Sequence, residues 1–163
     1  MIAEILKDMI EYFENDVRRI NHAIKVYTIA KNIGENEKVS DENLFIIEIA
    51  AILHDIGIKI SEEKYNSSSG KYQEIEGPGV AKEILKKYNL KHKILERVLF
   101  LIGNHHSYSK IDNIDFQILI EADFIINIYE DKLLKDSIVS IKEKYFKTKI
   151  GNSYIETMYL NNI

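Results

Sequence analysis

His54 and Asp55 directly follow the apolar segment AAIL at residues 50–53, whose side chains a helix would bury. His22 precedes Val26 by four residues and so shares the apolar stripe of its own helix. Burying an imidazole or a carboxylate costs free energy unless the group finds a partner. The sequence therefore predicts that these polar side chains meet a partner in the interior.

Two further segments show the same pattern, because His105 and His106 follow the apolar run VLFLI and Asp123 lies between Ile120 and Ile126. A lone histidine on an apolar face is more often a hydrogen-bonded core residue than a metal ligand. Six such groups in a small core are better explained by one shared partner, a divalent cation. The chain has no cysteine, and imidazole with carboxylate suits Fe, Mn, Co, Ni or Zn.

The elements that must position these residues are helices, since the sequence has only one proline and seven glycines and its apolar residues recur at helical spacing. We expect one all-α domain over residues 1–163. The predicted helices span 2–13, 15–33, 41–57, 78–89, 91–105, 113–130, 132–146 and 152–160. The polar, serine-rich segment 58–77 is predicted to be an irregular loop. Ser40 is a predicted N-cap, Gly34 a predicted helix end, and Pro78 a predicted first-turn residue.

Composition excludes several classes of protein. The 163 residues suffice for one domain with a core, and 45% hydrophobic with 29% charged residues is typical of a globular protein. No apolar run reaches the roughly 18 residues that span a bilayer, and the N-terminus lacks the basic start of a signal peptide, so we expect a cytoplasmic protein without membrane contact. The net charge of -4 gives no footprint for nucleic acid. The sequence contains no P-loop, HExxH or GxSxG motif.

The order His22, His54-Asp55 and Asp123, with the central motif HDIG, resembles the signature of the HD-domain metal-dependent phosphohydrolases. The resemblance covers roughly residues 15–130 and leaves a C-terminal helix and tail at 132–163. It implies a single-domain HD-type helical bundle in which these four residues hold a metal.

Members of this superfamily that hold two metals use an additional histidine after HDIG and a His-His pair further on. Here His105 and His106 supply the pair, and Glu76 is the nearest candidate by spacing for the place of the additional histidine. A carboxylate can replace an imidazole as a ligand, so the resemblance leaves one or two divalent transition-metal ions open. The GYP motif of the cyclic-dinucleotide phosphodiesterases is absent.

The resemblance implies hydrolysis of a phosphate ester, expected to be that of a nucleotide, by a hydroxide that the metal generates. Asp55 would bridge two ions. The net negative chain needs cations for the phosphoryl oxygens, and Arg19 and Lys59 are the candidates for this catalytic and substrate-binding role. Lys71 and Tyr72, in the predicted loop, are candidates for contacts with the rest of the substrate.

Two other functions stay open at this point. Some HD-fold proteins use a di-iron centre for oxygenation, and a metal-dependent nucleotide sensor would bind its ligand without turnover. In each case the expected partner is a small molecule, phosphorylated in the leading hypothesis. The apolar side of the first predicted helix, residues 2–13, could pack internally or form a homodimer contact.

Overall fold

The computed structural model describes residues 1–161, and within them the chain forms helices joined by turns, with no strand. The predicted all-α class is confirmed. The α-helices are α1 (Ile2–Phe13), α2 (Val17–Asn36), α3 (Asp41–Leu53), α4 (Ile58–Tyr65), α5 (Gly70–Leu85), α6 (His92–Ile102), α7 (Ile114–Glu130), α8 (Lys135–Tyr145) and α9 (Lys149–Ile155). Short 3-10 turns occur at Lys86–Tyr88 and Tyr108–Lys110, and a π-helical turn at Glu156–Leu160 follows α9.

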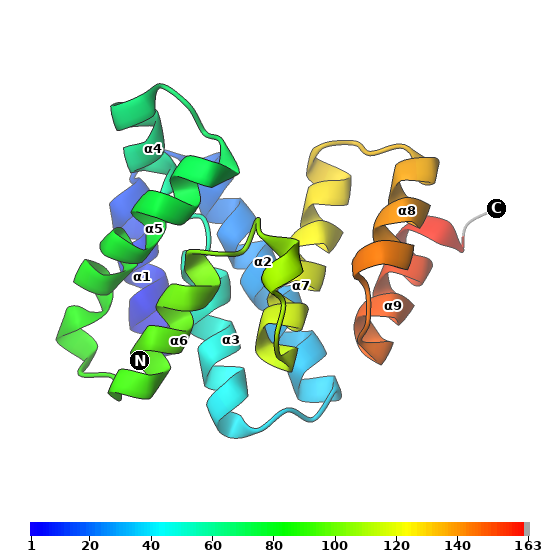
Figure 1. Ribbon diagram of the computed structural model, residues 1–163, viewed down its shortest axis with the longest axis horizontal. Coiled ribbons are helices and arrows are strands. Elements are labelled where there is room, and N and C mark those ends of the chain that lie inside the picture. Colours follow the sequence, from blue (N-terminus) through cyan, green and yellow to red (C-terminus); the bar gives the residue numbers. More distant parts are fainter. Residues whose placement is uncertain (162–163) are drawn as a thin grey trace.

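Helices α2, α3 and α7 pack against one another at the centre of the molecule. Helices α1, α4, α5 and α6 lie on one side of this centre, and α8 and α9 lie on the other (Figure 1). Apolar side chains such as Ile33 on α2, Ile47 on α3 and Leu119 on α7 are fully buried where the central helices meet. This arrangement brings residues that are a hundred positions apart in the sequence to one place.

The predicted irregular loop at 58–77 is wrong, because α4 and the first half of α5 occupy most of it. Only residues 66–69 form a turn, and Asn66 ends α4 in the left-handed conformation. The rings of Tyr65 and Tyr72 stack at a centroid distance of 4.1 Å and join the two helices across the turn. Three of the serines, at 67–69, lie in this turn, and tertiary contacts of this kind, invisible in the local composition, favour the helices on either side of it.

The predicted helix ends are partly confirmed. Ser40 is the N-cap of α3, and its hydroxyl accepts a hydrogen bond from the Asn43 amide at 3.2 Å. Gly34 does not end α2, which continues to Asn36. Pro78 lies in the middle of α5 rather than in its first turn, since the helix begins at Gly70.

Gly57, the last residue of the HDIG motif, allows α5 to approach the turn between α3 and α4. A Cβ atom on Gly57 would lie 2.6 Å from the backbone nitrogen of Gly77 on α5. Any larger residue would push α5 away from the turn that carries the motif. Within the described residues, no helix combines the length and the apolar character needed to cross a membrane.

Candidate metal centre

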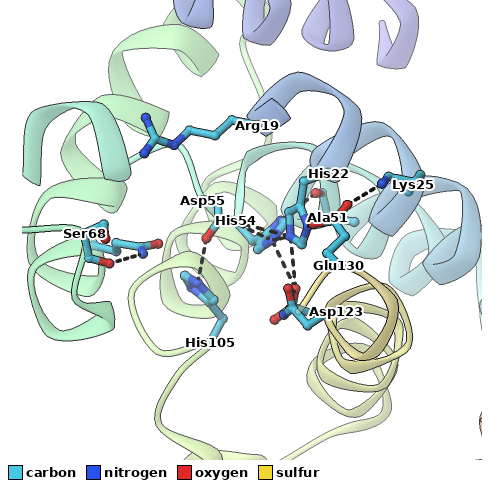
Figure 2. Close-up of polar contacts among 12 residues, drawn as sticks. Arg19, His22, Lys25, Ala51, His54, Asp55, Ser68, His105, Asp123 and Glu130 are labelled. Carbon is cyan, nitrogen blue, oxygen red and sulfur yellow. Dashed lines mark hydrogen bonds and ion pairs between the residues drawn. The ribbon is translucent and has the colours of Figure 1, made fainter. Parts of the chain in front are cut away.

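Six of the predicted ligands converge where α2, α3, α6 and α7 meet. Figure 2 shows five of them, His22, His54, Asp55, His105 and Asp123. His22 projects from α2 and Asp123 from α7. His54 ends α3, and Asp55 follows it in the turn toward α4. The last two, His105 and His106, lie in the turn after α6.

The first cluster consists of His22, His54 and Asp123. The two histidine Nε2 atoms lie 3.1 Å apart. Asp123 Oδ1 lies 3.2 Å from His22 Nε2 and 3.6 Å from His54 Nε2. Three ligand atoms at these separations can hold one cation between them.

The second cluster consists of Asp55, His105 and His106. Asp55 also reaches the first cluster, because its Oδ2 lies 3.6 Å from the Nε2 atoms of both His22 and His54. Its other oxygen, Oδ1, lies 3.4 Å from His105 Nε2. One carboxylate therefore faces both clusters, the placement expected of a ligand that two cations share.

Hydrogen bonds fix the orientation of the buried imidazoles. His54 Nδ1 lies 2.9 Å from the carbonyl oxygen of Ala51, and His105 Nδ1 lies 2.8 Å from that of Ile102. A carbonyl oxygen only accepts, so each Nδ1 carries a proton, and in the neutral imidazole Nε2 is then the nitrogen whose lone pair can bind a cation. His105 Nε2 is buried and has no hydrogen-bond partner within the described residues. An orphaned basic nitrogen facing a carboxylate fits a metal site.

Glu130, the last residue of α7, orients His22 and was not identified from the sequence. Its Oε2 lies 2.8 Å from His22 Nδ1, and its Oε1 accepts a hydrogen bond from Lys25. Glu130 follows Asp123 by seven residues, a spacing that places both on one face of a helix. That spacing was the available signal.

Another acidic residue of α7, Glu121, is fully buried and was also not identified from the sequence. Its Oε1 accepts hydrogen bonds from Gln117 Nε2 at 2.7 Å and from the amides of Lys147 and Thr148 at 2.6 and 2.9 Å. The hydroxyl of Thr148, the N-cap of α9, donates to Oε2. Glu121 thus ties α7 to the start of α9, and this bond network stabilises the helix that carries Asp123.

The pKa values reflect strong mutual electrostatic interaction in the centre. Burial lowers the pKa of His22, but the carboxylates of Asp123, Asp55 and Glu130 outweigh it and raise the value to about 9. Burial raises the pKa values of Asp55 and Asp123, and the neighbouring imidazoles hold both well below the usual range. Burial and the adjacent imidazole lower the pKa of His106 to about 4, so it is neutral at pH 7. Two ionised carboxylates among imidazoles favour a bound cation.

A cavity of about 220 Å³ opens onto the centre. Arg19 lines it together with His22, Asp55 and Ser68. The guanidinium of Arg19 donates to Asp16 Oδ2 and, through its other terminal nitrogen, to Glu62 Oε1, both at 2.6 Å. The structure thus places the first predicted phosphate-binding cation beside the clusters, with two carboxylates holding it.

Glu76 does not lie with the other predicted ligands, which corrects its assignment as a metal ligand. Its oxygens accept hydrogen bonds from Lys64 Nζ at 2.7 Å and Tyr65 OH at 2.8 Å on α4. These bonds hold its pKa below the ordinary value. The neighbouring residue Glu74 faces the second cluster instead, and its Oε1 accepts from the backbone amide of His106 at 3.1 Å.

The other predicted substrate-binding residues also lie outside the wall of the cavity. Lys59 Nζ donates to the backbone oxygen of Tyr12 at 3.1 Å and pairs with Glu14 at 3.4 Å. Tyr72 stacks on α4, as described above, and Lys71 Nζ lies 5.9 Å from the centre of the Tyr72 ring. The helical course of 58–65 and 70–77 turns these side chains away from the metal centre.

Comparisons with known proteins agree with this geometry. A family model described as HD domain matches residues 19–144. The fold is similar to the crystal structure of a predicted HD superfamily hydrolase from an uncultured Thermotogales bacterium, with a TM-score of 0.70 and 23% sequence identity. That match covers 96% of this chain and 84% of the other. No curated protein matches the chain. Because the family match spans most of the sequence, the resemblance is confirmed and the chain belongs to the HD domain family.

Proposed function

We propose that this protein is a metal-dependent phosphohydrolase that acts on a small phosphate ester, with nucleotides as the first class of substrate to test. The observation that carries the proposal is the position of Asp55. Its two oxygens face His22 and His54 on one side and His105 on the other, at the inner end of a cavity that Arg19 lines. A carboxylate between two sets of imidazoles, with a guanidinium in the cavity wall, suits the transfer of a phosphoryl group to water.

The donor set suits a divalent transition metal such as Fe, Mn, Co, Ni or Zn. His22, His54, Asp55 and Asp123 would hold one ion, and His105 and His106 would share Asp55 in holding a second. A divalent cation lowers the pKa of a coordinated water to about 7 and neutralises charge on phosphoryl oxygens.

The residues of the chain have three tasks in this proposal. The carboxylate of Asp55 orients the reacting groups relative to both clusters. The guanidinium of Arg19 is positioned by Asp16 and Glu62 so that it meets the negative charge of the ester at the cavity wall. Asn127 also lines the cavity, and its side-chain amide donates a hydrogen bond to Asp123 Oδ1 at 2.9 Å. This bond fixes the orientation of the Asp123 carboxylate.

The test is phosphate release from nucleoside monophosphates, p-nitrophenyl phosphate and bis(p-nitrophenyl) phosphate, after removal of metal and reloading with Mn, Co or Fe. Asp55→Ala should lose metal and activity together. His92→Ala is the matched control, because the side chain of His92 is 84% exposed and, among residues 1–161, pairs only with Glu96 on its own helix. It should bind metal and turn over as the unaltered protein does.

Each result has a definite meaning. Activity on the monoester alone, or on the diester as well, would define the ester class. Full activity in Asp55→Ala would refute the proposal. Oxygen consumption that depends on iron, without phosphate release, would favour the di-iron oxygenase. Tight nucleotide binding to the metal-loaded protein without any turnover would favour a sensor.

A further inference from the structure

Gln73 on α5 is a buried amide that points at the second cluster. Its side chain is only 6% exposed. The Nε2 atom donates to the backbone oxygen of Ser68 at 2.8 Å, on the side of the metal centre where Figure 2 labels Ser68. A backbone oxygen can only accept, so this bond fixes which end of the amide faces which way. The oxygen Oε1 therefore faces His106, whose Nε2 lies 3.5 Å away.

The contact between Gln73 and His106 is a poor hydrogen bond. A distance of 3.5 Å lies beyond the usual range of about 2.7 to 3.2 Å for a nitrogen donor and an oxygen acceptor. Within the described residues, Oε1 has no other hydrogen-bond partner. The carbonyl oxygen and the imidazole nitrogen are buried and face each other without a short bond. The lone pairs of both atoms are therefore free to coordinate a cation between them.

The backbone around Gln73 is shaped for this approach. A Cβ atom on Gly70, at the start of α5, would lie 2.5 Å from the ring of His106. Only a residue without a side chain lets α5 come this close to the His-His turn. The result is that Gln73, one turn further along α5, is held against the second cluster rather than in solvent.

We propose that Gln73 is a ligand of the second ion, which its amide oxygen coordinates together with Asp55, His105 and His106. This inference rests on the proposed metal-dependent function. The first position then has two imidazoles and two carboxylates, whereas the second has two imidazoles, a shared carboxylate and a neutral oxygen. The second ion is consequently bound more weakly, because a neutral amide oxygen takes the place of a carboxylate.

The test is a titration of the metal-free protein with Co²⁺. Calorimetry measures the affinity of each equivalent, and visible absorption reports the ligands of each ion. Gln73→Leu should bind the first equivalent as before and the second at least tenfold more weakly. Gln73→His should change the absorption of the second equivalent alone, because an imidazole replaces an oxygen ligand. Glu76→Gln is the matched control on the same helix, and both equivalents should behave as in the unaltered protein.

Contrary results are equally clear. An unchanged second affinity in Gln73→Leu would overturn the assignment. If that variant fails to fold, as circular dichroism would show, Gln73→His decides, since an unaltered spectrum of the second equivalent means that the residue is no ligand. Binding of a single ion by the unaltered protein would overturn the inference and leave hydrolysis with one ion intact. Binding of none would refute the proposed function as well.

Discussion

The metal-free protein should lose stability as the pH rises from about 6.5 to about 9, because of His22. The carboxylates around His22 raise its pKa from 6.5 to about 9 in the folded protein. A raised pKa means that the protonated imidazole stabilises the fold. This contribution is complete below pH 6.5 and is lost as the pH passes through 9. At 1.36 kcal/mol per pKa unit, the loss is roughly 3 kcal/mol.

Urea denaturation in the presence of a chelator, followed by circular dichroism at pH 6.5 and pH 9, measures this loss. His22→Gln should remove most of it, and the part that remains belongs to His54, whose pKa Asp55 and Asp123 raise. Other shifted groups titrate outside the window, since the pKa of His106 is lowered to about 4 and that of Tyr108 is raised to about 12. Equal stability of the metal-free protein at the two pH values would refute the reasoning, as would an unchanged loss in His22→Gln.

Three substitutions test the surroundings of the centre. Glu130→Gln should weaken binding of the first ion about 10- to 100-fold, as calorimetry would show, because the residue orients a ligand without touching the ion; unchanged affinity would contradict that role. Glu121→Ala should lower the free energy of unfolding by about 3 kcal/mol or more in urea denaturation, since it leaves several buried donors unpaired. Gly70→Ala should reduce metal binding in the turn of His106, whereas Gly79→Ala, where a Cβ atom would meet nothing within 4 Å, should leave it unchanged.

The sequence was most informative where helix periodicity alone decides the outcome. His22 and Asp123 share faces with buried apolar residues on α2 and α7, so their convergence could be predicted from spacing. His54 and Asp55 follow the apolar stripe of α3 and lie beside His22 and Asp123 in the metal centre. The fold class and the family followed from the same residues.

Prediction failed where the residue at which a helix begins could not be read from the sequence, because that residue decides which side chains face the core. The sequence predicts a loop that includes residues 70–77, and within a loop only the spacing from HDIG points to Glu76. Once α5 begins at Gly70, Gln73 and Glu74 face the His-His turn and Glu76 faces Lys64 on α4. The packing of α4 against α5 decides which side chains of α5 face the metal centre. Sequence spacing across a turn cannot predict this.

The bond between Glu121 and the start of α9 affects where the chain can be divided. The family match ends at residue 144, yet Glu121 takes its donors from residues 147 and 148. A fragment cut at the family boundary would keep every ligand, yet it would leave the buried carboxylate of Glu121, two residues from Asp123, with Gln117 as its one remaining donor among the described residues. Such a fragment would need Glu121 replaced by an apolar residue, or an end beyond α9, to retain an ordered metal-binding helix.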